Sequence, residues 1–245
     1  MNILLSLIIL SFLAPDDALL NMGISRQTRQ AVLVTTTSWE SQSGTLRTYS
    51  RLHDRWTEIG SEIMVTIGQS GLGWGNGLHK EVMDGPKKIE GDGKAPAGIF
   101  KLGPAFGYYE NFLPGSKLPY RHITERDYFI DDPQSRDYNQ WVSLPENVTN
   151  NPQARWSSFE RMKRKDNLYE LGIVIRHNTD PVIKGRGSAI FFHVWRKHGA
   201  PTAGCTAMAR DNLLALIQWL DPALEPRLVQ VPFSEMNKIR MSEGR

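Results

Sequence analysis

Short stretches rich in β-branched and aromatic residues, separated by turns that contain glycine or proline, make up most of this chain. This pattern is typical of β-strands. Strands are predicted at residues 62–67, 98–102, 171–176, 189–194 and 227–231. A loop is predicted over 68–77, which holds five glycines, and a polar segment at 106–160 with several prolines predicts loops and short strands.

One segment has helical periodicity instead. Leucines stand at positions 213, 216 and 220, with an isoleucine at 217, which places them on one face of a helix over residues 211–220. Asp211 or Asn212 can cap its start, and Asp221-Pro222 predicts its end. The pattern therefore predicts a mostly β (α+β) fold with a single helix near the C-terminus.

The N-terminal residues form a short, uncharged apolar run over 3–14, followed by Pro15. The run is too short for a membrane span and suits the core of an export signal, although no lysine or arginine precedes it. We expect an exported protein of the periplasm or cell envelope, with an N-terminal anchor as the alternative. The predicted organisation is a signal-like segment at residues 1–22, a spacer or extension at 23–61, a main domain at 62–232 and a tail at 233–245.

Composition and net charge argue against two classes of protein. Of 245 residues 40% are apolar and 22% charged, and the formal net charge is +3. The small basic excess gives no reason to expect nucleic-acid binding, and no second long apolar segment predicts an integral membrane domain. The dense basic stretch at 161–165 is interpreted as a solvated surface.

The chain has a single cysteine, Cys205, which follows Gly204 in Pro201-Thr202-Ala203-Gly204-Cys205. A lone cysteine forms no intramolecular disulfide and no multi-cysteine metal site, so burial or reactivity remains. Gly204 allows close approach of a substrate. Twelve positions earlier, His193 ends a predicted buried strand, and this pairing indicates a thiol nucleophile with its base.

Two segments resemble the YkuD-type L,D-transpeptidase catalytic domain of bacterial cell-wall enzymes. The segment 88–100, Lys-Ile-Glu-Gly-Asp-Gly-Lys-Ala-Pro-Ala-Gly-Ile-Phe, is similar to the family's upstream Gly-Asp…Thr-Pro-x-Gly-x-Phe signature. His193 with the residues 202–205 resembles the His…Ser/Thr-His-Gly-Cys block. Ala203 and Ala207 stand where the family has a histidine and an arginine or asparagine, so the chain resembles a divergent branch over about residues 62–232.

The resemblance implies a β-sandwich or barrel with a helix after the nucleophile loop, and a cysteine acyltransferase acting on peptidoglycan stem peptides. Cys205 would be the nucleophile and His193 the proton donor and acceptor. Backbone N–H groups at Gly204 and Cys205 would hold the oxyanion, and Thr202 would orient the loop. Asp92 is expected to form a turn.

Weaker candidates for substrate binding lie at or just after the ends of the predicted strands 171–176 and 189–194. Arg196 lies between the base and the nucleophile, and Arg176 and His177 follow the strand at 171–176. The histidines show no metal-ligand spacing, so neither a metal nor another cofactor is expected. The segment 106–160 is the candidate lid or specificity element.

Two alternatives stay open on sequence grounds. An L,D-carboxypeptidase or related peptidoglycan hydrolase on the same fold would release the acyl group to water rather than to an amine. A non-catalytic envelope protein that binds wall peptides would keep a relic site, for which Ala203 and Ala207 are also evidence. The retention of both His193 and Cys205 favours an enzyme.

Overall fold

The computed structural model describes residues 15–82, 84–111 and 114–242. Its elements are α1 (Pro15–Asn21), β1 (Gln30–Thr36), β2 (Ser43–Leu52), β3 (Arg55–Thr66), β4 (Leu72–Trp74), β5 (Ala95–Gly107), β6 (Tyr120–His122), β7 (Asp127–Phe129), β8 (Trp141–Ser143), η1 (Pro152–Ala154), β9 (Glu160–Arg161), β10 (Leu171–Arg176), β11 (Phe191–Val194), β12 (Thr206–Met208), α2 (Arg210–Trp219), η2 (Pro222–Leu224), β13 (Arg227–Pro232) and η3 (Phe233–Glu235). The mostly β fold class predicted from the sequence is confirmed.

The main sheet curves into a barrel. Its strands follow the order β10-β11-β12-β3-β2-β1-β13-β5-β4, and an additional pairing of β5 with β10 closes the path. Antiparallel pairs dominate, while β1 with β13 and β11 with β12 are parallel. Closure removes the exposed edges that an open sheet would present.

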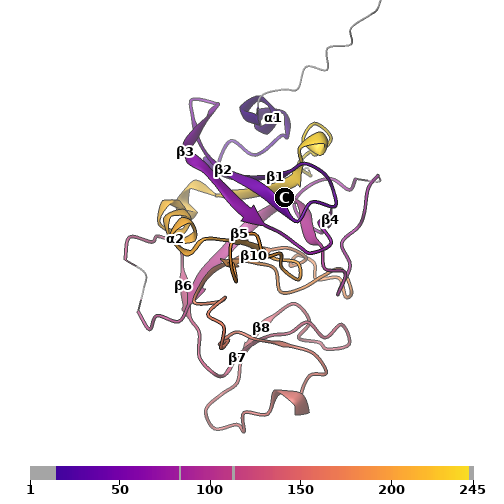
Figure 1. Cartoon of the computed structure of the whole chain (residues 1–245), viewed down its shortest axis with the longest axis vertical. Helices are drawn as coiled ribbons and strands as arrows, with labels where there is room; N and C mark the ends of the chain where they lie inside the picture. Colours follow the sequence, from indigo (N-terminus) through magenta and orange to yellow (C-terminus); the bar gives the residue numbers. More distant parts are fainter. Residues whose placement is uncertain (1–14, 83, 112–113, 243–245) are drawn as a thin grey trace, which may run out of the picture.

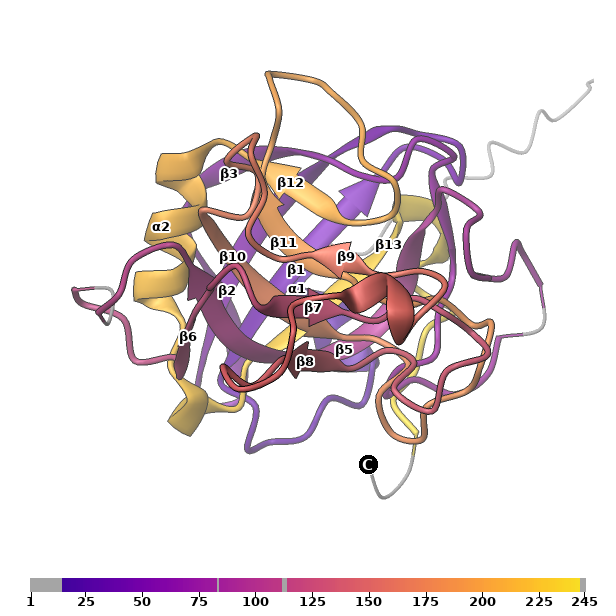
Figure 2. The same ribbon diagram turned by 90° about the horizontal axis from the view of Figure 1, so that it is seen from below.

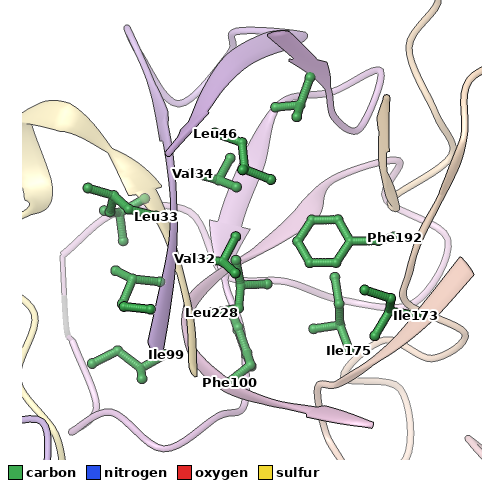
Figure 3. Close-up of a cluster of buried hydrophobic side chains, with 14 of the residues drawn as sticks. Val32, Leu33, Val34, Leu46, Ile99, Phe100, Ile173, Ile175, Phe192 and Leu228 are labelled. Carbon is green, nitrogen blue, oxygen red and sulfur yellow. The ribbon is translucent and has the colours of Figure 1, made fainter. Parts of the chain in front are cut away.

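The barrel interior holds the main hydrophobic core, and Figure 3 shows part of it. Val34 of β1 lies opposite Leu46 of β2 there, and Phe192 of β11 lies opposite Ile173 of β10. Alternation explains this packing, because every second residue of a strand points inward. In the fully buried β1, a run of alanine, valine and leucine fills both faces.

A smaller sheet of β7, β8 and β9 lies as a separate layer beside the barrel (Figures 1 and 2). It belongs largely to the segment 106–160, where loops and short strands were predicted and are confirmed. Phe129 and Met162 from this layer pack with Phe106 and Phe191 of the barrel in a second hydrophobic cluster, which also contains Cys205. The segment therefore forms one wall around the candidate nucleophile.

Helix α2 packs against β10 and β11. Its buried residues Leu213, Leu216 and Ile217 lie on one face, as the periodicity predicts. The helix starts one residue before the predicted start and ends at Trp219, just ahead of Asp221-Pro222. The strand predicted at 227–231 is confirmed as β13, and that at 171–176 as β10.

The N-terminal region differs from the expected spacer at residues 23–61. Strands β1 and β2 lie inside the main sheet, and β1 pairs along its length with β13, almost two hundred residues later. The expected tail at 233–245 also contributes, since Met236, Ile239 and Met241 are buried in the main core. The predicted signal-like segment falls mostly at residues 1–14, outside the described residues.

Candidate active site

Cys205 stands at the entry to β12, next to the strand that carries His193. The parallel register pairs Phe192 with Thr206 and His193 with Ala207. The thiol Sγ lies 3.4 Å from the Phe191 backbone N–H, which donates to it, and 3.4 Å from the Ala189 carbonyl, to which it donates. Its residue is only 7% exposed, so the thiol is held at the inner wall of the site.

His193 lies on the same face of β11 as Phe191, two residues earlier, because side chains alternate along a strand. Its Nδ1 is 2.8 Å from the Val194 carbonyl oxygen, which only accepts, so Nδ1 carries the proton. Nε2 is therefore unprotonated, and it has no hydrogen-bond partner in the described part of the chain. Burial lowers the pKa of His193 to about 4, which keeps the imidazole neutral at physiological pH.

Both side chains line one pocket of about 660 Å³. Charged residues around its walls are Lys88, Glu90, Asp131, Glu160, Arg164, Arg196 and Lys197. The pocket is lined by Ile190 and His193 from the region of β11 and by Asp131 and Glu160 from the region of the small sheet. A substrate bound in this cavity would contact both the Cys205 sulfur and the His193 imidazole.

The loop before the nucleophile is fixed by one hydroxyl group. Thr202 Oγ1 accepts a hydrogen bond from the Gly204 N–H at 3.1 Å and donates to the Cys205 carbonyl at 2.6 Å. Gly204 has φ +153°, and a Cβ there would lie 3.0 Å from the Lys94 carbonyl oxygen, so the position favours glycine. The Gly204 N–H is thereby committed to the loop, whereas the Cys205 N–H has no hydrogen-bond partner among the described residues.

The charge distribution around the sulfur disfavours a resting thiolate. Burial is the largest cause that raises the pKa of Cys205, and the negative charge of Glu160 raises it further. Glu160 accepts a hydrogen bond from the Tyr169 hydroxyl, and the Tyr169 ring lies 5.4 Å from the His193 ring. Burial raises the pKa of Glu160 itself to about 7.

The segment that resembles the family's upstream signature forms the loop ahead of β5 and the start of that strand. Asp92 accepts hydrogen bonds from the backbone N–H groups of Ile89 and Lys94, which confirms the predicted turn. The same carboxylate pairs with Lys88 at 2.6 Å, and both side chains are at least nine-tenths buried. This ion pair holds the loop against the pocket, which Lys88 and Gly91 line.

The three weaker candidates for substrate binding, Arg196, Arg176 and His177, do not lie in one site. Arg196 lines the pocket and lies 3.5 Å from Asp166. His177 is fully buried elsewhere, where Nδ1 accepts from the Asn76 N–H and Nε2 faces the Arg186 carbonyl at 2.9 Å. Burial lowers the pKa of His177 to about 3. Neither His177 nor Arg176 lines the pocket of Cys205; Arg176 lies in a different groove.

Several pocket residues carried no sequence signal. Glu160 and Tyr169 are held near the sulfur by the packing of β9 and the turn before β10 on β11. Glu90 lay within the recognised signature, yet its bonds to Tyr138 and Ser188 join parts of the chain far apart in sequence. The raised pKa of the Glu160 carboxyl group near the Cys205 thiol marks Glu160 as a site residue in the structure. The sequence contains no comparable signal.

Within the described part of the chain, no group of histidine, cysteine, aspartate and glutamate side chains is arranged to hold a metal ion. None of the described helices has the length and apolar character needed to cross a membrane.

Comparison with known proteins identifies the class. The YkuD family model, described as the L,D-transpeptidase catalytic domain, matches residues 45–231, and the chain belongs to this family. The membership confirms the resemblance seen in the sequence. No curated protein matches the sequence.

Solved structures give more distant similarities. The helical cell shape determining protein Pgp2 from Campylobacter jejuni is 17% identical, with a TM-score of 0.40 over 88% of this chain and 54% of that chain. A lysine-to-alanine mutant of Pgp2 is 18% identical, with a TM-score of 0.37 over 86% and 49%. The chain thus spans about half the length of these structures.

Proposed function

We propose that this protein is a cysteine acyltransferase of the cell envelope that acts on peptidoglycan stem peptides as an L,D-transpeptidase. The observation that carries the proposal is the shared pocket of Cys205 and His193, with Nδ1 of the imidazole bonded to a carbonyl so that Nε2 is free to accept a proton. Because peptidoglycan lies outside the cytoplasmic membrane, the protein is expected to be exported.

In the proposed acylation step, His193 Nε2 takes the Cys205 proton as the sulfur attacks the carbonyl carbon of a stem-peptide amide. The C–S bond forms, and the carbonyl electrons move to oxygen. We propose the Cys205 N–H, which has no partner among the described residues, as a donor to that oxyanion. When the C–N bond breaks, the imidazolium returns the proton to the leaving amine, and a thioester remains.

The second step decides the reaction type. An amine of another stem peptide attacks the thioester, His193 accepts its proton, and the thiol is regenerated with a new amide bond. If water replaces the amine, the product is a free carboxylate, and the enzyme is an L,D-carboxypeptidase. The alanines at 203 and 207 remove side chains that the family commonly has near the cysteine, and this favours keeping hydrolysis as the second candidate.

A resting neutral pair, rather than a thiolate–imidazolium pair, fits the electrostatics. The pKa of the thiol is raised by burial, and that of His193 is lowered to about 4 by the same cause. Proton transfer is therefore expected to accompany attack on the substrate, as in serine-type acyl transfer, rather than to precede it.

The proposal is tested by mass spectrometry of the full chain incubated with a disaccharide-tetrapeptide muropeptide. Wild type is expected to show a covalent adduct that the Cys205→Ala variant lacks, and His193→Gln is expected to form it at least 100-fold more slowly, on the order of a lost general base. Crosslinked dimers identify a transpeptidase, and tripeptide alone identifies a carboxypeptidase.

Cys205→Ser serves as the matched control, because it keeps the shape of the side chain and removes the thiol. Circular dichroism must show that each variant keeps the wild-type fold. If folded wild-type protein forms neither adduct nor product while binding the muropeptide, the non-catalytic envelope protein is the better description.

A further inference from the structure

Three basic residues form a row across adjacent strands of the barrel, away from Cys205. In the register of the sheet, Lys101 of β5 lies directly opposite Arg176 of β10 on one side and Arg227 of β13 on the other. Residues directly opposite one another place their side chains on the same face. With strands about 4.8 Å apart, the row is about 10 Å long.

The row faces away from the main core. Its immediate neighbours Phe100, Ile175 and Leu228 are buried in that core, so alternation directs the three cations outward. Lys101 and Arg176 are exposed, and neither forms a side-chain hydrogen bond or ion pair with the described residues. Arg227 is partly buried and pairs with Glu225 at 2.9 Å.

A groove of about 680 Å³ runs along this row. Besides the three cations it is lined by Pro104, Pro119, Pro222 and Pro226, with Leu102 and Leu118. Prolines and leucines give the groove stiff, apolar walls, because proline fixes its backbone and lacks a donor N–H. The groove combines an apolar surface with a strip of positive charge.

Like charges directly opposite each other in a sheet are destabilising, so a row of three cations with one internal carboxylate partner is an unfavourable arrangement for stability alone. Oxyanions bound along the row would offset that repulsion. Arginine and lysine together provide both a planar fork and a point charge for such groups.

We propose that this groove binds the carboxylates of peptidoglycan peptides and holds the wall polymer beside the enzyme, apart from the substrate in the Cys205 pocket. The proposal rests on the proposed function for the identity of the polymer. A peptide strand suits the groove because it brings several carboxylates together with apolar side chains, which the prolines and leucines can contact.

The groove and the Cys205 pocket are distinct but related in space. They share no lining residue. Strand β10 connects them: Gly172 pairs with His193, and Arg176 lies four residues further along, about 13 Å away. Val174, between them, packs against the cluster that contains Cys205, so alternation places Arg176 on the same face of the sheet.

The test is co-sedimentation of the full chain with purified peptidoglycan sacculi freed of attached polymers. All proteins carry Cys205→Ala so that no turnover occurs. Adding Lys101→Gln and Arg176→Gln together is expected to weaken binding about tenfold, as the loss of two charge-assisted contacts implies. Arg227 is left unchanged because it bonds to the backbone carbonyls of Glu225 and Pro226.

A matched pair controls for net charge. Arg55→Gln with Arg155→Gln removes two exposed arginines that have no side-chain partner among the described residues and lie outside the groove. This pair is expected to bind sacculi like the parent. Equal weakening by both pairs, or no weakening by the Lys101 and Arg176 pair, would overturn the proposal.

Two further measurements test whether the groove binds phosphate rather than peptide carboxylates, and whether it is part of the reaction site. Binding to inorganic polyphosphate without binding to sacculi would assign the row to phosphate and overturn the proposal. With Cys205 restored, Lys101→Gln with Arg176→Gln is expected to change turnover of a soluble muropeptide less than twofold; a large loss would make the groove part of the reaction site. Failure of the acylation test leaves the sacculus measurement valid, so the two proposals fail separately.

Discussion

At the scale of single residues, hydrogen bonds determine which atoms of His193 and Cys205 carry protons. The Val194 carbonyl selects the Nδ1–H tautomer of His193. The Cys205 sulfur accepts a hydrogen bond from the Phe191 N–H and donates one to the Ala189 carbonyl. Glu160 adds a negative charge beside this thiol. Its own pKa of about 7 means that the charge develops within the physiological range.

Glu160→Gln is expected to make the thiol more reactive. The substitution removes a charge that raises the pKa of Cys205, so a larger thiolate fraction exists at a given pH. The rate of alkylation by iodoacetamide at pH 8, where Glu160 is ionised in the wild type, should rise about threefold to tenfold; at pH 5.5 the two proteins should differ little. Glu62→Gln, on the exposed surface, is the control. Equal rates at pH 8 would show that Glu160 does not act on the sulfur.

His193→Gln is expected to change how stability depends on pH. The folded-state pKa of His193, about 4, lies below its ordinary 6.5, so the unfolded chain binds the proton first as the pH falls. Stability is therefore lost between pH 6.5 and 4, by about 3 kcal/mol for the full shift. Urea denaturation at pH 7 and pH 4.5 should show a smaller difference for the variant. A remaining decrease is expected from His177, whose pKa is also lowered. An unchanged difference between the two pH values would contradict the assignment.

At the scale of elements, the loop before β5 links the family signature to the pocket. The buried pair Lys88 and Asp92 closes this loop, and Asp92 also accepts two backbone hydrogen bonds. The turn was predictable from Gly-Asp-Gly, because such residues favour turns. The ion pair was not, since nothing in the sequence shows that both side chains would be buried together.

Asp92→Ala is expected to destabilise the fold by about 3 to 5 kcal/mol, because it leaves the Lys88 ammonium group buried without its counter-ion. Chemical denaturation measures the loss. Asp211→Ala provides the control, because Asp211 pairs with Arg210 at the surface and should cost less than about 1 kcal/mol. Similar losses for both variants would show that the buried pair has no special role.

At the scale of the whole molecule, the barrel depends on strands that the sequence analysis placed outside the catalytic domain. β1 lies between β2 and β13 and is buried along its whole length. The family match begins at residue 45, after β1 and within β2. A barrel that lost β1 would expose the core face of β13 and two unpaired edges.

Removing residues 1–44 is therefore expected to abolish cooperative folding. The full chain should show near-ultraviolet circular dichroism and a sigmoidal unfolding curve, and the truncated chain should be insoluble or show neither. A soluble, cooperatively unfolding fragment 45–245 would instead show that residues 23–44 of the expected spacer are dispensable for folding. The double variant Val32→Asp with Val34→Asp, which charges the core face of β1 without shortening the chain, should give the same loss of folding.

Local sequence patterns were enough to predict several strands, the helix, the likeness to the L,D-transpeptidase domain, and Cys205 and His193 as candidate site residues. These depend on periodicity and on residues close in the chain. Tertiary structure alone decided the place of β1 beside β13, the burial of Lys88 with Asp92, and the arrival of Glu160 near the sulfur. It also moved Arg176 from the expected cleft into a row with Lys101 and Arg227. The place of β1 and the row of cations depend on register between strands far apart in sequence, which is fixed only when the whole barrel closes. The burial of Lys88 with Asp92 and the position of Glu160 depend on the packing of distant segments around the pocket.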